Sequence, residues 1–540
     1  MSKTDCMPTL QQALATYRSD LLDRLAQPQT YDIAIVGGGA TGLGLALDAA
    51  VRGLRVVLVD SHDFAKGTSS RSTKLVHGGV RYLAQGNISL VREALHERTL
   101  LLHNAPYLAQ PLPFVVPAYH WWEAPFYGAG LKMYDVLAGR AGLGATEFLD
   151  RRETLQNLPT LLEPGLKGGV KYWDGQFNDA RLAIALARTA AKQGALLVNY
   201  CRATDLIYKD GAVAGLVCQD QIGDGEFRIT SRCVVNATGV WVDELRQKDG
   251  LAVPAKSGQT TLTMVAPSQG VHMVVDREFL NADAALMVPK TSDGRVLFAV
   301  PWLGKVILGT TDTPRHDLDC EPMAFDEEIE FILGESGRYL RRAPRRADVK
   351  SIWVGLRPLV KPPQNEGNNT KTLSREHTIL VSRSGLVTVT GGKWTTYRAM
   401  AEDVLDKCAE AGLVEATAKG QTQRLLLVGA DGVESPILPI YQAPGWHSYG
   451  NEQEYVRQLP GADDILCPGL TGAMVRFAVR HEYALRIEDV LARRSRLLFL
   501  DARIAIDLAG RVADIMKSEG VAAPDAEGFA ALASNYSLKI

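Results

Sequence analysis

The order of apolar and polar residues predicts a βαβ unit near the start of the chain. Tyr31–Val36 is a short apolar run rich in β-branched residues, which is typical of a buried parallel strand. A glycine-rich turn follows, and then an alanine- and leucine-rich helix that extends to about Arg52, where Gly53 is placed to end it. Arg55–Asp60 repeats the strand pattern, so the segment has the layout of a parallel crossover unit.

The middle of the chain predicts one long helix followed by short strands. Asp179–Gln193 is alanine-rich and ends at Gly194, and Asp210-Gly211 is typical of a tight hairpin turn. Strands are predicted at Leu196–Tyr200, Thr204–Tyr208, Cys233–Ala237, Thr261–Val265, His272–Val275, Val296–Val300 and Val306–Gly309. The last four alternate in the manner of an antiparallel sheet.

Beyond about residue 408 the pattern changes again. Residues 425–468 are rich in Pro and Gly, whereas 470–519 carry apolar residues at helical spacing. Pro362–Lys371 predicts an exposed loop, and Leu10–Leu25 predicts an amphipathic helix. No apolar run is long enough to predict a transmembrane helix, and the N-terminus lacks the apolar core of a secretory signal.

Composition and charge narrow the class of protein. The chain has 540 residues, of which 46% are hydrophobic and 22% charged, as in a soluble protein of two or three domains. Its 59 basic and 61 acidic residues give a formal net charge of −2, which does not support nucleic acid as a partner. Seven scattered cysteines form no CxxC motif and suit a reducing compartment, and no metal site is expected.

The turn after the first strand carries a dinucleotide-binding fingerprint. Gly37, Gly39 and Gly42 have the spacing that allows a tight turn, close approach of a pyrophosphate and close packing of the helix. Asp60 follows Gly42 by eighteen residues, at the end of the second strand, where an acid can accept a hydrogen bond from a ribose hydroxyl. NAD and FAD are both compatible with this unit.

A second polar, glycine-rich segment follows the acid directly. Residues 67–79, GTSSRSTKLVHGG, are too polar for a simple strand or helix, and their small hydroxyl side chains suit contacts with phosphate and ribitol oxygens. The mixed apolar, cationic and aromatic residues 80–83 come next and favour a partly buried segment over a solvated loop.

Six ordered motifs resemble those of the FAD-dependent glycerol-3-phosphate dehydrogenases, which belong to the D-amino-acid-oxidase-like flavoproteins. They are GTSSRSTKLVHGGVRYL (67–83), DGQFNDARL (174–182), VVNATGVW (234–241), LGTTDT (308–313), GLRPL (355–359) and GGKWTTYR (391–398). The resemblance runs from about residue 30 to 405 and resumes weakly at 474–505. It implies FAD as cofactor and oxidation of glycerol 3-phosphate to dihydroxyacetone phosphate, with electrons passed to a membrane quinone.

The resemblance implies a mixed α/β fold of three parts. Residues 30–110, 165–255 and 350–405 are expected to form a discontinuous Rossmann-like FAD-binding domain. Residues 111–164 and 256–349 are expected to form an antiparallel-sheet substrate or cap domain. A C-terminal helical domain is expected at 406–540.

The family's cofactor and substrate residues map onto definite positions here. The expected FAD-binding residues are Gly37, Gly39, Thr41, Gly42, Asp60, Ser69, Ser70, Thr73, Lys74, His77, Gly78, Ala237, Gly239, Gly391, Gly392, Lys393 and Thr395. Lys393 matches a family lysine near the flavin, where a cation stabilises the negative charge that the reduced ring gains. Arg81, Tyr82, Arg357 and Arg375 match substrate-binding positions, and guanidinium suits phosphate because its planar fork donates two hydrogen bonds.

The expected catalytic residues are His272, Arg357 and Lys393. Oxidation of the alcohol requires removal of its hydroxyl proton, and His272 matches a family active-site histidine. His77 and His377 also lie in or near motifs, so the identity of the base stays open. The residues before His272, 266–269, are uncharged here where the family usually carries basic residues.

Other functions remain as alternatives. An oxygen-using glycerophosphate oxidase, an amino-acid oxidase of the same fold and a non-catalytic FAD-binding scaffold share the cofactor motifs. The motifs of hydrolases and of nucleoside-triphosphatases are missing from the sequence. The oligomeric state is open, with a homodimer as one alternative.

Two segments predict peripheral attachment to the inner, cytoplasmic face of the cell membrane. Residues 112–138 are rich in aromatic and apolar groups, including Trp121, Trp122, Phe126 and Tyr127, which suit a membrane interface. Residues 338–350 are rich in arginine, which attracts anionic headgroups. A buried core explains the first segment equally well, and a solvated charged face explains the second.

Overall fold

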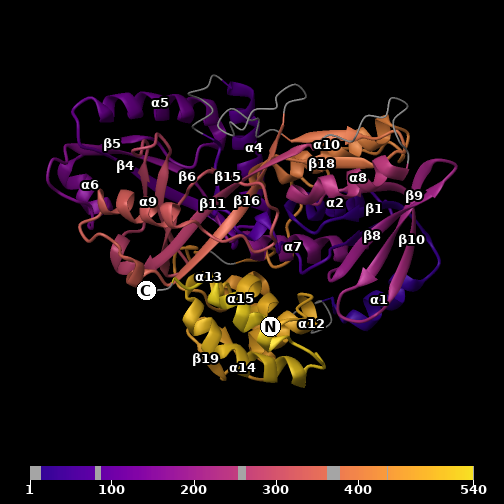
Figure 1. Ribbon diagram of the computed structural model, residues 1–540. Helices are drawn as coiled ribbons and strands as arrows, with labels where there is room; N and C mark the ends of the chain where they lie inside the picture. The colour runs from indigo at the N-terminus through magenta and orange to yellow at the C-terminus, as the bar shows by residue number, and fades with distance from the viewer. Residues whose placement is uncertain (1–13, 80–86, 253–262, 362–376, 434–435, 539–540) are drawn as a thin grey trace, which may run out of the picture.

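A computed structural model describes residues 14–79, 87–252, 263–361, 377–433 and 436–538 of the protein (Figure 1). These residues form two large β-sheets and a C-terminal group of helices. The expected substrate residues Arg81, Tyr82 and Arg375 lie outside the described residues, as do the predicted loop at 362–371 and the first two residues of the predicted strand Thr261–Val265.

The first sheet has eight strands in the order β17-β18-β10-β1-β2-β7, and β9 and β8 extend it from β10. Its strands are β1 (Thr30–Val36), β2 (Val56–Val59), β7 (Leu196–Val198), β8 (Cys201–Lys209), β9 (Ala212–Asp220), β10 (Glu226–Asn236), β17 (Thr378–Val381) and β18 (Val387–Thr390). β1 is parallel to both β2 and β10, so the predicted βαβ unit is confirmed. Asp210 and Gly211 both have positive φ, at 53° and 80°, as the predicted hairpin turn requires.

Helices pack against this sheet, and its strands are apolar because they are buried on both faces. They are α1 (Arg18–Ala26), α2 (Ala40–Val51), α7 (Asp179–Lys192), α8 (Val242–Ala252) and α10 (Tyr397–Glu410). α2 packs closely on α10 because residue 44 is a glycine: a Cβ there would lie 2.6 Å from the ring of Tyr397. Every residue of β2 is buried, as expected for a strand covered on both sides.

The second sheet has ten strands and is antiparallel except where β12 runs parallel to β4. Its strands are β3 (Leu75–Val76), β4 (Ala109–Ala118), β5 (Glu147–Asp150), β6 (Gly168–Phe177), β11 (Val265–Asp276), β12 (Ala285–Val288), β13 (Leu297–Trp302), β14 (Lys305–Gly309), β15 (Thr313–Pro314) and β16 (Ser351–Val360). Helices α4 (Ile88–Asn104), α5 (Glu123–Ala138), α6 (Arg151–Asn157) and α9 (Asp326–Gly337) accompany it.

The ranges predicted for the domains divide the chain differently from these sheets. β3, β6 and β16 fall within the ranges predicted for FAD binding, yet their hydrogen bonds join them to the second sheet. A strand belongs to the sheet of its hydrogen-bonded neighbour, and order along the chain does not reveal that neighbour. The division into domains stays a prediction.

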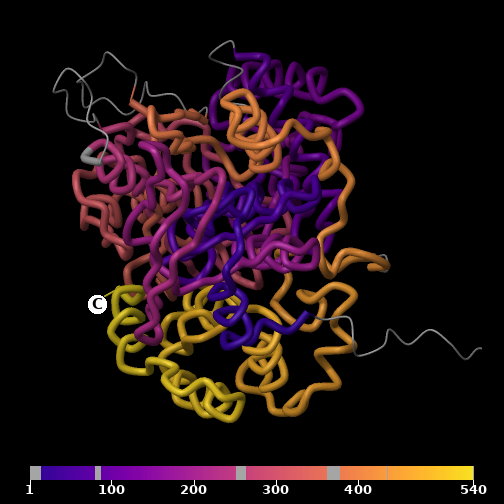
Figure 2. The backbone as a smooth tube through the Cα atoms, turned by 90° about the vertical axis from the view of Figure 1, so that its right-hand side faces the viewer, coloured from indigo at the N-terminus to yellow at the C-terminus, as the bar shows by residue number. Residues whose placement is uncertain are grey.

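The C-terminal residues form a helical part below the two sheets, orange and yellow in Figure 2. It contains α11 (Gln453–Gln458), α12 (Gly472–His481), a π-helix at Asp489–Arg494, α13 (Leu497–Leu500), α14 (Ala502–Ser518) and α15 (Ala526–Ser534), with a small hairpin of β19 (Ile465–Cys467) and β20 (Leu470–Thr471). The predicted helical pattern at 470–519 is therefore confirmed. The described N-terminal residues run beside it, where the Thr16 N–H donates to the Arg480 carbonyl at 2.9 Å.

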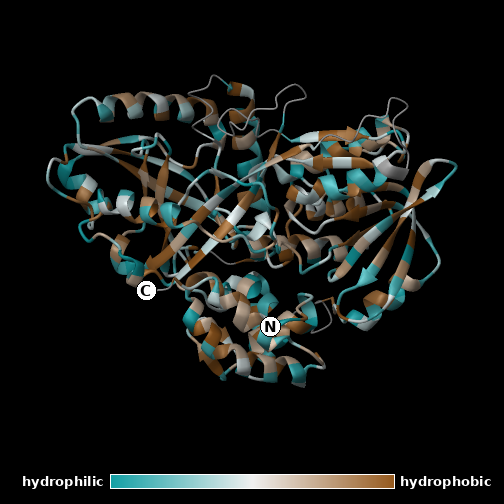
Figure 3. Ribbon diagram, in the orientation of Figure 1, coloured by the Kyte–Doolittle hydropathy of each residue, from teal (hydrophilic) through white to brown (hydrophobic). Residues whose placement is uncertain are grey.

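The hydrophobic residues concentrate in the strands and on the inner faces of the helices (Figure 3). One core lies around the first sheet, another joins the second sheet to the C-terminal helices, and a third lies between the second sheet and α9. Within the described ranges, no helix is both long enough and apolar enough to cross a membrane.

Candidate cofactor and substrate site

The glycine-rich turn between β1 and α2 can be formed only by residues without a side chain. Gly37 has φ of +110°, and a Cβ on it would lie 2.6 Å from the Ala237 carbonyl oxygen at the end of β10. A Cβ on Gly42 would overlap the carbonyl oxygen of Gly37. The turn therefore brings the N-terminus of α2 against the ends of β1 and β10, and leaves backbone N–H groups at the positive end of the helix dipole.

Asp60 closes the other side of the same turn. Its carboxylate accepts hydrogen bonds from the Gly38 N–H at 2.6 Å and from the His62 N–H at 2.8 Å. Burial raises the pKa of this carboxyl to about 6, although both backbone hydrogen bonds act in the opposite direction. Asp60 is thus placed at the end of β2 as an acceptor, as the sequence predicts.

A cavity of about 400 Å³ opens between these elements. Ten of the residues predicted to bind the cofactor line it: Gly37, Gly39, Thr41, Asp60, Ser69, Ala237, Gly239, Gly391, Gly392 and Lys393. They come from four segments that are far apart in the sequence, at the ends of parallel strands of one sheet. Ligands in open α/β sheets bind at this edge.

The remaining predicted cofactor residues do not line the cavity. Gly42, Ser70, Thr73, Lys74, His77, Gly78 and Thr395 are outside the lining set. Lys74 is buried and its Nζ lies 2.7 Å from Asp179 Oδ2, so it forms an internal ion pair. Thr395 donates to the His77 carbonyl at 3.3 Å, which joins the segments 67–79 and 391–396. Their role in binding the cofactor stays a prediction.

Several lining residues were not predicted from the sequence. His62, Lys66, Trp241, Pro358 and Trp394 line the cavity and lie within or between the recognised motifs, so their position in the sequence is a signal that could have found them. Arg202, Glu244 and Lys248 also line it, and they belong to no motif.

The shape and chemistry of the cavity fit a dinucleotide. Gly239 leaves space where a side chain would stand, since a Cβ on it would meet no atom within 4 Å, whereas a Cβ on Gly39 would lie 3.1 Å from the Ser69 hydroxyl. A glycine turn, the start of α2 and an acid at the end of β2 are the three features that bind a pyrophosphate and a ribose. A volume of about 400 Å³ lies in the range of small-molecule sites.

The second sheet contributes a polar surface beside this cavity. β11 and β16 pair in register over ten residue pairs, from Val265 with Val360 to Val274 with Ser351. Ser268 is opposite Arg357, and His272 is opposite Trp353. Since alternate residues of a strand share a face, these four side chains lie on one face. The next residue after Arg357, Pro358, lines the cavity.

Two glycines lie between His272 and Arg357 on this face. Gly270 and Gly355 are opposite each other there, and a Cβ on Gly270 would overlap the Arg357 guanidinium. A Cβ on Gly355 would lie 2.7 Å from the Arg71 carbonyl oxygen, so the segment 71–73 passes over the sheet at this point. The Thr73 hydroxyl then reaches His272 Nε2 at 2.9 Å.

The Arg357 guanidinium is held in one orientation by neighbouring oxygens. Nη1 donates to the Gln269 carbonyl at 3.3 Å and to Asp312 at 3.1 Å. Nη2 donates to the Thr310 hydroxyl at 3.1 Å and to the Thr311 carbonyl at 3.0 Å. The motif at 308–313 therefore serves to fix a cation on this face.

His272 is buried and stacks on Trp353, with ring centroids 5.4 Å apart. Burial lowers its pKa well below the usual value, and the charges of Lys74 and Arg357 lower it further. The imidazole is therefore neutral near pH 7 and able to accept a proton. Of the alternative histidines, His377 has its Nε2 atom 2.9 Å from Asp403 Oδ2, and the backbone carbonyl of His77 accepts a hydrogen bond from Thr395.

The glycines before Lys393 close the cavity from β18. Gly391 and Gly392 both have positive φ, at 82° and 75°, and a Cβ on Gly392 would strike Met400 Sδ of α10. This bend places Lys393 in the lining of the cavity. Trp394 follows and donates its indole N–H to the Ser69 carbonyl at 2.8 Å, so the two motif segments hold each other.

Fold and site together define a flavoprotein oxidoreductase. Residues 32–398 match the family described as FAD dependent oxidoreductase, and residues 420–521 match the C-terminal domain of alpha-glycerophosphate oxidase. The chain belongs to this FAD-dependent family, and within it to the glycerol-3-phosphate dehydrogenases. FAD is its cofactor.

Curated and solved relatives support this assignment. The mitochondrial glycerol-3-phosphate dehydrogenase of Bos taurus is 38% identical over 92% of this chain and 71% of its own. That of Arabidopsis thaliana is 39% identical over 90% of this chain and 82% of its own. The crystal structure of the Bacillus halodurans glycerol-3-phosphate dehydrogenase with FAD superposes with a TM-score of 0.75 at 28% identity, covering 97% of this chain and 99% of that one.

Proposed function

We propose that the protein oxidises sn-glycerol 3-phosphate to dihydroxyacetone phosphate, with FAD in the cavity as the first electron acceptor. The observation that carries this is the placement of a buried, neutral His272 and a fixed Arg357 on one face of β11 and β16, where the residue after Arg357, Pro358, lines the cavity. A phosphorylated secondary alcohol requires a proton acceptor and fixed cations. The names of the relatives support this substrate.

Each of the three catalytic candidates has one role in this proposal. His272 accepts the hydroxyl proton of the substrate, because its lowered pKa keeps the imidazole neutral. Arg357 attracts the anionic substrate, because its neighbours already hold its orientation. Lys393 lines the cavity and supplies positive charge beside the cofactor. When bound, FAD supplies a two-electron acceptor for the hydrogen on the alcohol carbon.

Anaerobic mixing with glycerol 3-phosphate tests this function directly. The flavin absorbance near its visible maximum should bleach within the mixing experiment, whereas glycerol, which lacks the phosphate, should bleach it far more slowly. Glycine and proline serve as controls for the amino-acid oxidase alternative. Bleaching by an amino acid but not by glycerol 3-phosphate would overturn the proposal, and no bleaching by any substrate would favour the scaffold.

We further propose that electrons leave to a membrane quinone and that α5 attaches the protein to the inner face of the cell membrane. The segment 112–138 has two parts. Its first residues belong to β4 and are mostly buried in the core, whereas α5 exposes apolar side chains. Trp121 is 82% exposed, Phe126 67% and Val136 79%. Met133 is exposed on the same helix, and Phe148 is exposed nearby.

The α5 patch, defined as Trp121, Trp122, Phe126, Met133 and Val136, has the composition of an interfacial membrane contact. Contiguous exposed apolar groups are uncommon on the surface of a soluble protein, and tryptophan favours the headgroup region. α5 lies at the edge of the molecule remote from the C-terminal helices (Figure 1). An apolar quinone dissolved in the bilayer is reached most easily from such a surface.

The arginine-rich segment 338–350 does not strengthen the membrane proposal. Its arginines pair with acids, as in Arg341 with Glu163 at 2.6 Å and Arg346 with Asp326 at 2.7 Å. Arg342 contacts both Glu278 and Asp348. Because nearby carboxylates balance these charges, the segment carries little excess positive charge toward a headgroup, and the proposal rests on α5.

Flotation with anionic liposomes tests attachment. Phe126→Asp combined with Val136→Asp should abolish recovery in the lipid fraction, because each carboxylate is costly to place at an apolar interface. Ile465→Asp is the matched control, since Ile465 is 67% exposed in the C-terminal part and should leave flotation unchanged. Equal loss in both variants, or no flotation of the parent protein, would contradict attachment.

Comparison of acceptors separates dehydrogenase from oxidase. A soluble quinone analogue should reoxidise the flavin much faster than dissolved oxygen does, with little peroxide. Rapid production of peroxide would support the oxygen-using alternative, whatever the outcome of flotation.

A further inference from the structure

The segment Asp60–Ser69 has two faces, and only one of them serves the cavity. Its residues that line the cavity are Asp60, Ser61, His62, Ala65, Lys66, Gly67, Thr68 and Ser69. Asp63 and Phe64 are the members of this segment that do not line it, and both are fully buried on the other side. We call this segment the cofactor turn.

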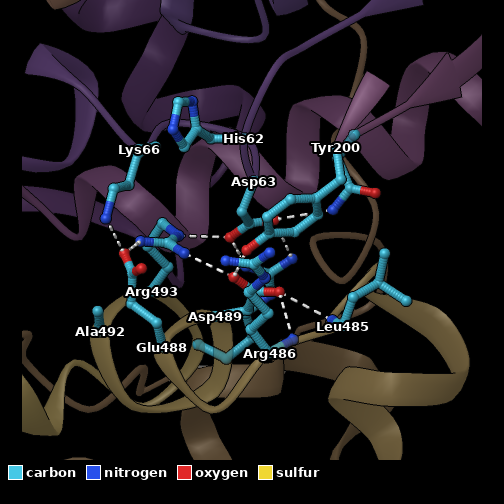
Figure 4. Close-up of polar contacts among 12 residues, drawn as sticks. His62, Asp63, Lys66, Tyr200, Leu485, Arg486, Glu488, Asp489, Ala492 and Arg493 are labelled. Carbon is cyan, nitrogen blue, oxygen red and sulfur yellow. Dashed lines mark hydrogen bonds and ion pairs between the residues drawn. The ribbon is translucent and has the colours of Figure 1, made fainter. Parts of the chain in front are cut away.

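The hidden face of the cofactor turn is bound by the C-terminal part. Phe64 packs edge-on against Tyr483, with ring centroids 5.2 Å apart. The Asp63 carboxylate accepts hydrogen bonds from the guanidinium groups of Arg493 and Arg494, the latter through Nη2 at 2.9 Å. Both arginines are buried and belong to the π-helix at Asp489–Arg494. Figure 4 shows Arg493 between Asp63 and the acids of its own segment.

The arginines are themselves fixed from the C-terminal side. Arg493 Nη1 donates to Glu488 at 2.5 Å and Nη2 donates to Asp489 at 2.6 Å. Asp489 also accepts the Tyr200 hydroxyl at 2.6 Å and the backbone N–H groups of Leu485 and Arg486. The position of the Arg493 guanidinium is therefore fixed by the C-terminal part, so it cannot move if the cofactor turn shifts.

A second contact reaches a residue that lines the cavity. Glu488 accepts from Lys66 Nζ at 2.5 Å, and Glu321 forms an ion pair with the same ammonium at 2.5 Å. Arg496 Nη2 donates to the Ser70 carbonyl at 2.8 Å, immediately after the turn. The C-terminal part thus holds the cofactor turn at Asp63 and Lys66, and holds the chain just after the turn at Ser70.

The backbone of the turn needs such support. Ala65 has φ of +60°, a left-handed conformation that side chains other than glycine adopt at a cost. A residue in this conformation persists when surrounding contacts hold it. Its N–H donates to the Gly38 carbonyl at 2.9 Å, which ties the strained position to the glycine fingerprint.

We propose that Asp63, Arg493 and Arg494 are positioning residues for FAD, so that the C-terminal part holds the cofactor turn in its binding conformation. FAD binding and docking of the segment 488–496 are then mutually reinforcing, because a coupling between two sites is reciprocal. The proposal rests on the placement of FAD in the cavity, but not on the substrate or the electron acceptor.

The test compares release of the flavin with unfolding of the protein in the same holoenzyme. Flavin fluorescence reports release on heating, and far-ultraviolet circular dichroism reports unfolding. Asp63→Asn should release flavin at least 5 °C below its unfolding transition, and its FAD dissociation constant should rise about tenfold or more. The parent protein should show the two transitions together.

Glu452→Gln is the matched control. Glu452 forms a two-pronged ion pair with Arg188 of α7 at 2.6 and 2.7 Å, and so joins the C-terminal part to the body away from the cofactor turn. Its loss should lower both transitions together and change the dissociation constant less than twofold. A merely structural ion pair behaves in this way.

Arg493→Lys keeps the proposal testable if Asp63→Asn does not fold. Lysine retains one charge toward Asp63 but lacks the fork that contacts three acids, so an intermediate loss of FAD affinity is expected. Hydrogen exchange adds a second measure: FAD should slow exchange of amides in 485–500 in the parent, and less so in Arg493→Lys.

Two outcomes would overturn the proposal. One is an unchanged dissociation constant with coincident transitions in both Asp63→Asn and Arg493→Lys. The other is exchange in 485–500 that does not respond to FAD. A parent protein that binds no FAD would instead refute the placement of the cofactor, so the two failures are distinguishable.

Discussion

The cofactor side of the site is built from backbone and glycine, whereas the substrate side is built from long polar side chains. At the ends of β1, β10 and β18, four of the lining positions are glycines with positive φ, namely Gly37, Gly239, Gly391 and Gly392. On β11 and β16 the chemistry belongs to His272 and Arg357, each fixed by neighbours more than forty residues away in the chain.

This difference means that the two sides should fail in different ways. A side chain added at Gly37 or Gly42 collides with backbone, which cannot move aside cheaply, so binding of FAD is lost with stability. A side chain changed on the substrate side removes a charge or a proton acceptor but leaves the cavity intact. Substitutions on that side should slow the reaction in a protein that remains yellow.

The largest effect is expected from Gly42→Ala. Its Cβ would overlap the Gly37 carbonyl oxygen, so the start of α2 must shift from β1 and the turn must open. Overpacking of this kind costs about 3 kcal/mol, and FAD should be absent from the purified protein. Flavin absorbance and denaturant unfolding measure the two effects.

Gly510→Ala is the control for this substitution. A Cβ there meets no atom within 4 Å on α14, and alanine is favoured over glycine in a helix by about 1 kcal/mol. This variant should bind FAD and unfold at slightly higher denaturant. Retention of FAD by Gly42→Ala would contradict a backbone-built cofactor side.

His272→Asn should give the next largest effect. Loss of a general base slows proton transfer by about 10² to 10⁴, while the flavin spectrum should show full occupancy. Anaerobic stopped-flow measurement of flavin reduction gives the rate. A parental rate in this variant would assign the proton to another group.

The pH dependence of the same step sharpens this prediction. The pKa of His272 is lowered, so the neutral imidazole is present at neutral pH and is lost only as pH falls well below 6.5. The reduction rate of the parent protein should therefore stay level from pH 8 to 6.5 and decline at lower pH. A decline centred at or above pH 6.5 would contradict a buried neutral histidine.

Arg357→Lys should lower kcat/KM less than His272→Asn lowers the rate of flavin reduction. The ammonium keeps a charge but cannot make the contacts to both Asp312 and Thr310 that orient the guanidinium. Loss of charge-assisted contacts worth about 1.5–3 kcal/mol predicts a fall in kcat/KM of roughly ten- to 150-fold. Arg346→Lys, on the surface, should leave kcat/KM unchanged.

The contrast between the two sides also explains what the sequence alone could predict. Gly37, Gly42 and Asp60 lie within one βαβ unit, and spacing along the chain was enough to place them. His272 and Arg357 are 85 residues apart, and only the register of β11 with β16 brings them to one face. Their roles were predicted only from the family resemblance, because the local pattern of apolar and polar residues does not show which strands pair.

The contacts of other residues could not be predicted for the same reason. Lys74 and Ser70 stay predicted cofactor residues, and the structure adds that Lys74 pairs with Asp179 and donates to the Ser70 carbonyl. No sequence motif marks Asp63 as a site residue, and its arginine partners lie about 430 residues further along the chain. The Asp63 carboxylate can be buried because the C-terminal part supplies two arginines, and no local sequence pattern around Asp63 predicts these partners.

The smallest effect is expected at Asp60, because the backbone of the glycine turn and the Asp60 side chain both contribute to FAD binding. Burial raises the pKa of this carboxyl to about 6, so ionised Asp60 is costly in the empty protein and valuable when a ribose hydroxyl donates to it. FAD affinity contributed by the carboxylate is present above pH 6 and is lost as pH falls through about 6. One unit below that value, the dissociation constant should be about tenfold higher.

Folding of the FAD-free protein should respond to pH in the opposite direction. The folded-state pKa of Asp60 lies above its ordinary value, so this group stabilises the fold at low pH and loses that contribution as pH rises through about 6. Asp60→Asn should remove both dependences, with a dissociation constant that is raised at pH 7 and nearly constant from pH 7 to 5. Titration of FAD against the protein at each pH measures the first effect, and denaturant unfolding measures the second. A dissociation constant that stays level in the parent protein from pH 7 to 5 would show that the N-terminal end of α2, rather than the carboxylate, determines the affinity.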